Sequence, residues 1–113
     1  MTKQELENNI LAAVEELRVA RSRLEPLAKD WALADTEYRK AHARAYCMEL
    51  GTVADKKARA DKESYGEMLR AHELDASREA VRDNVKALMV EISAYQTLAG
   101  LLKSEMAHLQ YEP

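Results

Sequence analysis

The chain has 113 residues and a mass of 12.8 kDa, which suits one domain or one assembly unit. Alanine, glutamate, lysine, leucine and arginine supply more than half of it, with three glycines, two prolines and no phenylalanine. This composition is typical of long helices and coiled coils and argues against sandwiches, barrels and doubly wound sheets. The net charge of −3 gives no general attraction to nucleic acid.

Targeting signals and membrane segments are not expected. No apolar run approaches the roughly 20 residues that a helix needs to cross a bilayer. The first ten residues are polar and partly acidic, unlike a secretory signal. A single cysteine, Cys47, excludes an internal disulfide and fits a reducing compartment. We therefore predict a cytoplasmic protein.

Residues 1–25 are predicted to form the first helix. Thr2 and Glu5 have the spacing of a capping box, in which the hydroxyl and the carboxylate each accept a hydrogen bond from a free backbone amide. Apolar residues then recur every three or four positions, as on one face of a helix: Leu6, Ile10, Ala13, Leu17, Ala20 and Leu24. Pro26 lacks an amide proton and its ring clashes with the preceding turn, so we expect a break or sharp kink near Glu25.

Residues 27–50 are predicted to form a second helix with a regular heptad seam. The seam steps by four and three through Leu27, Trp31, Ala34, Tyr38, Ala41, Ala45 and Met48. Gly51 supplies the residue type that commonly ends a helix, and Thr52 the type that begins one. The sequence therefore predicts a tight helical hairpin at residues 50–52.

Residues 53–110 are predicted to form a long third segment. Its apolar stripe steps without a slip through Val81, Val85, Leu88, Ile92, Tyr95, Ala99, Leu102, Met106 and Leu109. Upstream the register is poorer, and a polar patch at residues 62–64 lies beside Gly66, a residue type that weakens helices. This segment is either one bent helix or two pieces divided near residues 63–66.

These lengths predict self-association. Two short helices would cover barely one side of the third segment and would leave its bulky stripe in water. We therefore expect an oligomer interface formed by Val81, Val85, Leu88, Ile92, Tyr95, Leu102 and Met106. The predicted fold is all-α, a single domain over residues 1–113: an elongated helical hairpin with a long C-terminal coiled-coil-like helix, assembled as a homo-oligomer.

Enzyme chemistry is not expected. His42, His72 and His108 lie thirty or more residues apart, and none has a partner at metal-ligand spacing. Cys47 has no obvious activating base, and no phosphate-binding loop or nucleophile elbow is present. We predict no catalytic residues, no metal and no cofactor.

The most informative residues surround the hairpin. Residues 31–62 carry seven basic and five acidic side chains. Cations that follow phosphates, with aromatic faces on which bases stack, hold single strands without reading sequence. The candidate DNA-binding residues are Arg39, Lys40, His42, Arg44, Tyr46, Lys56, Lys57, Arg59 and Lys62. The competing interpretation is a solvated helical face, because acidic residues interleave with these cations and i,i+4 ion pairs would account for much of the pattern.

The order of features resembles one family, the phage recombination mediators of the UvsY type. The matching features are Trp31, the run from His42 to Tyr46 leading to Gly51, residues 76–85, and Leu102 to Ser104. The resemblance covers roughly residues 27–105. It places the family's basic pair on His42 and Arg44, with histidine where the family has lysine, and we expect Lys40, Lys56 and Lys57 to compensate.

The resemblance implies an all-helical protein that assembles into rings of six or seven subunits. Such a protein binds single-stranded DNA, contacts the single-strand-binding protein and the strand-exchange recombinase, and helps the recombinase displace the other. We therefore expect a non-enzymatic recombination mediator. The alternative is a coiled-coil scaffold or assembly chaperone that binds only protein, and a third possibility is a small regulator of a host enzyme.

Overall fold

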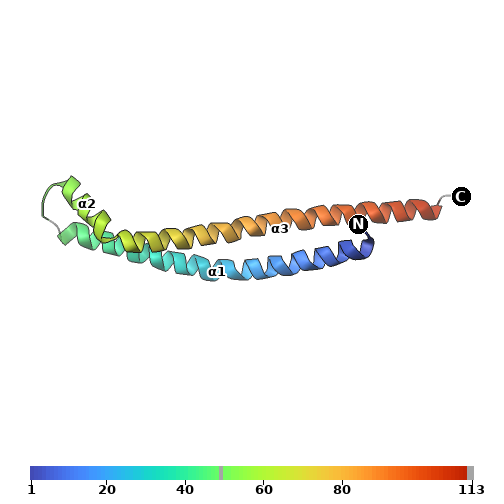
Figure 1. Ribbon diagram of the computed structural model, residues 1–113, viewed down its shortest axis with the longest axis horizontal. Coiled ribbons are helices and arrows are strands. Elements are labelled where there is room, and N and C mark those ends of the chain that lie inside the picture. Colours follow the sequence, from blue (N-terminus) through green and yellow to red (C-terminus); the bar gives the residue numbers. More distant parts are fainter. Residues whose placement is uncertain (49, 112–113) are drawn as a thin grey trace. The chain divides into compact units, whose positions relative to one another are not determined.

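A computed structural model describes residues 1–48 and 50–111, with side chains through residue 108 apart from Glu49. Over this part of the chain the fold consists of α1 (Lys3–Met48), α2 (Val53–Glu63) and α3 (Tyr65–Tyr111), which can be followed in Figure 1. The predicted all-α class, with a helical hairpin and a long C-terminal helix, is confirmed. None of the described helices is long and apolar enough to cross a membrane.

The first helix begins at the predicted capping box. The Glu5 amide donates to the Thr2 hydroxyl at 3.1 Å, and the Thr2 amide donates to Glu5 Oε2 at 3.0 Å. Two amides that no helical carbonyl reaches are thereby satisfied, which fixes where α1 starts.

Of the break or sharp kink predicted near Glu25, the break is wrong, because α1 runs through Pro26 and spans 46 residues. Residues 1–25 and 27–50 therefore do not form separate helices. Pro26 is exposed, so its ring displaces no core side chain. Leu24 and Leu27 on either side are half-buried and continue the same seam. Burial of the seam along the whole helix outweighs the roughly 3 kcal/mol that an interior proline costs.

The predicted hairpin is confirmed at the end of α1. Gly51 has φ of +133°, a region that side-chain-bearing residues rarely adopt. Thr52 then caps α2, since its hydroxyl accepts a hydrogen bond from the Asp55 amide at 3.2 Å. The chain therefore reverses between α1 and α2 with a glycine for the turn and a threonine for the restart.

The third segment is divided into two helices, which is one of the two predicted alternatives. Ser64 alone separates α2 from α3. Its side chain is fully buried, and its hydroxyl donates to the Ala60 carbonyl at 2.7 Å, which the Ser64 amide also reaches at 3.0 Å. A serine that bonds back to the preceding turn bends a helix, and this places the division at Ser64.

The chain was predicted as a single domain, and it divides into two compact units. Unit 1 comprises residues 1–22 and 81–113, and unit 2 comprises residues 23–80. In unit 1 the start of α1 runs antiparallel to the later part of α3, because Arg21 contacts Met89 at 3.6 Å while Leu6 shares a groove with Leu102. The buried side chains of this unit are Leu6, Ala13, Ala20, Val81, Val85 and Leu88.

This packing corrects the predicted oligomer interface. Val81, Val85 and Leu88 are each less than 9% exposed within one chain and offer no surface to a second copy. Ile92, Tyr95 and Leu102 are half-buried, and Met106 is 50% exposed. Leu109 lies outside the described side chains. The physical reason is that residues 1–22 of the chain pack against this part of α3 and bury the stripe within one chain.

Unit 2 has a core of small side chains. Ala34, Ala45, Ala60 and Ala71 are buried, and they allow helices to approach closely. The guanidinium of Arg78 lies 4.1 Å from the ring centroid of Trp31, and Arg78 Nη2 also contacts Asp75 at 2.7 Å. A charged residue is thus accommodated in the helical seam by stacking on an indole face.

Candidate nucleic-acid interface

The predicted DNA-binding residues all lie in unit 2, on the last turns of α1 and on α2. The helices place them through the turn at Gly51, which brings the two cationic segments alongside each other. Some of these residues contact other side chains of the protein, and others are exposed.

His42 does not serve as an exposed cation. Its Nε2 lies 2.8 Å from Asp61 Oδ1, and its ring packs edge-on against Tyr38 with centroids 6.1 Å apart. Asp61 is nineteen residues away along the chain, so this contact ties α1 to α2. His42, one of the two residues that the resemblance placed in the basic pair, therefore contacts other side chains of the same chain.

Arg39 is also neutralised locally. Its Nε lies 3.0 Å from Asp35 Oδ2, one helical turn earlier on α1. The pair is an i,i+4 ion pair of the kind that the solvated-face interpretation expects. Its contribution to stability is small because Arg39 is 78% exposed.

The aromatic part of the predicted site is partly covered. Lys56 lies over the Tyr46 ring, with its ammonium nitrogen 5.8 Å from the ring centroid, and both residues are half-buried. Such a cation–π contact occupies one face of the ring that a base would need. Tyr65 is 54% exposed at the start of α3, so it offers a freer ring near the same segment of chain.

Four of the predicted cations remain exposed and unengaged. Among the residues described, no ion pair joins Lys40, Arg44, Lys57 or Lys62 to a carboxylate. Arg59 is exposed as well. We call Lys40, Arg44, Lys57 and Lys62 the hairpin cations.

The hairpin cations lie on both helices of the hairpin and do not line one stripe. Lys40 and Arg44 are four residues apart and share a face of α1. Lys57 and Lys62 are five residues apart, which separates them by about 140° around α2. This arrangement suits a flexible polyanion that bends around the hairpin better than a rigid duplex with fixed phosphate spacing.

The sequence predicts these basic residues but does not predict all of the contacts that they make with acidic side chains. The Asp35–Arg39 pair has a visible signal, because the residues stand at i,i+4. The His42–Asp61 pair has none, since it depends on how α2 packs against α1. The contact between Trp31 and Arg78 was missed for the same reason.

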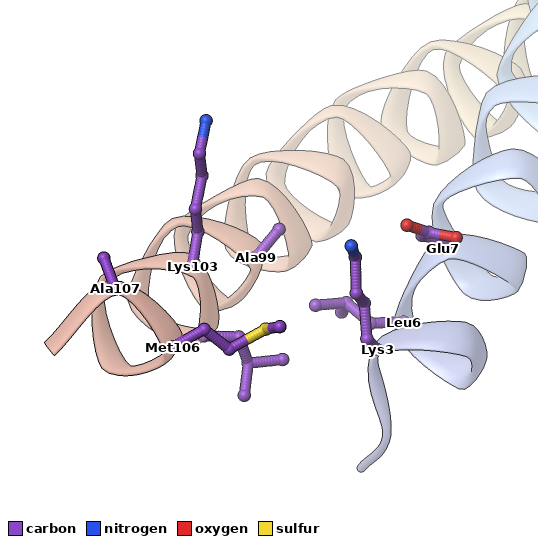
Figure 2. Close-up of a pocket in the computed structure, with 8 residues that line it drawn as sticks. Lys3, Leu6, Glu7, Ala99, Lys103, Met106 and Ala107 are labelled. Atoms are coloured by element: carbon purple, nitrogen blue, oxygen red, sulfur yellow. The ribbon is translucent and has the colours of Figure 1, made fainter. Parts of the chain in front are cut away.

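A groove in unit 1 is a second surface feature. Figure 2 shows it between the start of α1 and the last turns of α3, with a volume of about 510 Å³. Its lining is largely apolar, with side chains from Lys3, Leu6, Glu7, Ala99, Leu102, Lys103, Met106 and Ala107. Two predicted interface residues, Leu102 and Met106, thus line an open groove. The lining also carries the charged side chains of Lys3, Glu7 and Lys103 beside its apolar residues.

The described residues contain no group of three or more histidine, cysteine or acidic side chains that could hold a metal ion. Comparisons with known protein families, curated proteins and solved structures find no match to this chain.

Proposed function

We propose that this protein binds single-stranded DNA at the hairpin cations and carries out no bond chemistry. One observation carries the proposal: Lys40, Arg44, Lys57 and Lys62 are exposed and have no ion-pair partner among the described residues, while the neighbouring Arg39 is paired with Asp35. Side chains that keep their charge exposed in this way attract phosphates. Nothing in the arrangement reads base edges, so binding would be independent of sequence.

The proposal predicts a measurable salt dependence. Each phosphate neutralised on a single strand contributes about −0.7 to the slope of log K against log salt concentration. Four hairpin cations would therefore give a slope of about −3 per chain. The function as a recombination mediator rests on the resemblance to UvsY-type proteins, in which DNA binding serves to load a recombinase.

The experiment is a titration of fluorescent oligothymidylate at several salt concentrations. Arg44→Ala with Lys57→Ala should weaken binding and reduce the slope by about 1.4, as expected for two lost phosphate contacts. The matched control is Arg82→Ala with Lys103→Ala, which removes the same charge from exposed positions of unit 1. Absence of binding at low salt, or equal loss in both double variants, would reject the proposal.

The mediator role has its own test. Recombinase assembly on an oligonucleotide covered by single-strand-binding protein is followed with and without this protein. The proposal expects faster assembly with the wild type, and a reduced effect with the Arg44→Ala, Lys57→Ala variant. An unchanged assembly rate would leave a DNA-binding protein that is not a mediator.

The second candidate is a scaffold that binds only protein. Exposed apolar side chains on α3, with Val90 at 71% and Leu101 at 57% exposure, favour it. The oligonucleotide titration separates the two candidates, because a scaffold of this kind would not bind DNA at low salt.

A further inference from the structure

The face of α3 that points away from α1 in unit 1 carries a second apolar seam. Ala87, Val90, Ala94, Thr97 and Leu101 step by three, four, three and four residues, and Leu98 flanks them. Val90, Leu98 and Leu101 are 71%, 45% and 57% exposed, and the other members are exposed as well. We call Ala87, Val90, Ala94, Thr97 and Leu101 the outer seam.

The outer seam is distinct from the buried stripe. Val90 lies two residues from both Leu88 and Ile92, so it points about 200° away from them around the helix. Leu88 is 4% exposed because it packs within the chain. The partner of the outer seam therefore comes from outside unit 1, and α1 does not obstruct it.

The charged residues beside the outer seam indicate the kind of partner that it fits. Lys86 flanks it on one side and Glu91 on the other, five residues later, and both are exposed. In a parallel two-stranded coiled coil, residues with this spacing lie opposite each other across the two helices. An antiparallel pair brings like flanks together, so it does not place Lys86 against Glu91.

The intramolecular contacts leave both charges available. Among the described residues, Lys86 has no ion-pair partner. Glu91 Oε1 accepts a hydrogen bond from the Tyr95 hydroxyl at 3.0 Å, which raises the pKa of Tyr95 and orients the carboxylate. Among the described residues, no hydrogen bond engages the other carboxylate oxygen, which can accept one from an ammonium group.

We propose that a second copy of this chain docks on the outer seam, with the two α3 helices parallel and Lys86 of each facing Glu91 of the other. The small alanines allow close approach, and Val90 and Leu101 supply the apolar contact. This interface uses residues other than the hairpin cations and lies on the opposite face of α3 from the one that the heptad pattern first suggested.

The first test is mass in solution by sedimentation over a concentration series. The wild type should reach twice the 12.8 kDa chain mass. Val90→Glu with Leu101→Glu should halve it without loss of helicity, because both side chains are exposed. The matched control, Leu11→Glu with Val14→Glu, adds the same charge at exposed positions of α1 and should leave the mass unchanged. A wild type with the mass of one chain at every concentration, or equal loss in the control, overturns the proposal.

Charge reversal and cross-linking test the geometry. Lys86→Glu should weaken association, and adding Glu91→Lys should restore it. In a Cys47→Ser background, Ala87→Cys should form a disulfide with its own copy, and Leu101→Cys should do likewise. Failure of the second reversal to restore association, or cross-links that join position 87 to position 101 in mixed samples, would rule out the parallel pair.

Discussion

Gly51 occupies the conformationally most demanding position among the described glycines. Its φ is +133°, and a Cβ there would meet only Asp55 atoms at 3.5 Å or more, an ordinary contact. The cost of a side chain is therefore in the backbone and not in a clash. Gly100 lies within α3 with nothing within 4 Å of an added Cβ.

Alanine substitutions should have opposite effects at these two glycines. Gly51→Ala should lower the free energy of unfolding by about 1–3 kcal/mol, because alanine resists this backbone conformation. Gly100→Ala should raise it by about 0.5–1 kcal/mol, because glycine is a poor helix former. Urea denaturation followed by circular dichroism measures both. Destabilisation by Gly100→Ala would contradict a regular helix at that position.

Leu88 and Met89 are neighbours in opposite environments, since Leu88 is 4% exposed and Met89 is 48% exposed. Leu88→Ala should cost about 2–5 kcal/mol of stability through lost burial and a residual cavity. Met89→Ala serves as the control and should cost under about 1 kcal/mol. If Leu88 packs within one chain, its cost does not depend on protein concentration. A loss of stability that appears only at high protein concentration would indicate that Leu88 lies at an interface between copies.

At the scale of the helices, the predicted division of α1 at Pro26 was wrong, although the sequence contains a pattern that indicates one helix. The apolar seam steps by four and three from Leu6 to Met48, and Leu24 and Leu27 on either side of Pro26 keep the same phase. A break normally resets this phase, so the unbroken register indicated one helix. The continuous register therefore outweighs the local effect of Pro26 in determining the course of α1.

The termini and turns were predictable because they depend on local chemistry. The capping box at Thr2, the turn at Gly51 and the restart at Thr52 each involve residues within three positions of one another. Whether each basic side chain contacts an acidic one was not predictable in the same way. His42 contacts an aspartate on another helix, and only the packing of α2 against α1 determines that contact.

Pro26→Ala tests the continuity of α1. Because Pro26 is exposed within the helix, alanine should restore the missing hydrogen bond to the Ser22 carbonyl without removing buried surface. We expect stabilisation by about 1–3 kcal/mol in urea denaturation, given the cost of an interior proline. Asp30→Ala, at an exposed α1 position, is the control and should change stability by about 0.5 kcal/mol. No gain from Pro26→Ala beyond the control would indicate that the helix is interrupted there.

At the scale of the whole molecule, charge and association act together. The chain carries a net charge of −3, so one set of hairpin cations works against a repulsive background. In the proposed dimer, two sets of hairpin cations would be available to one strand, and the second set would bind as an intramolecular event. The proposed association would thereby raise the affinity for DNA without any new contact between one chain and DNA.

This coupling predicts how strand length affects binding. On an oligonucleotide long enough for both sets, the wild type should show a salt slope of about −6, twice the value expected for one chain. Val90→Glu with Leu101→Glu should show about −3 and bind more weakly, by a factor on the order of 10² or more. On an oligonucleotide that reaches only one set, the two proteins should bind alike. Leu11→Glu with Val14→Glu adds the same negative charge, so it should match the wild type on long strands if the loss comes from dissociation of the dimer. Equal weakening by both double variants would instead assign the effect to charge repulsion alone.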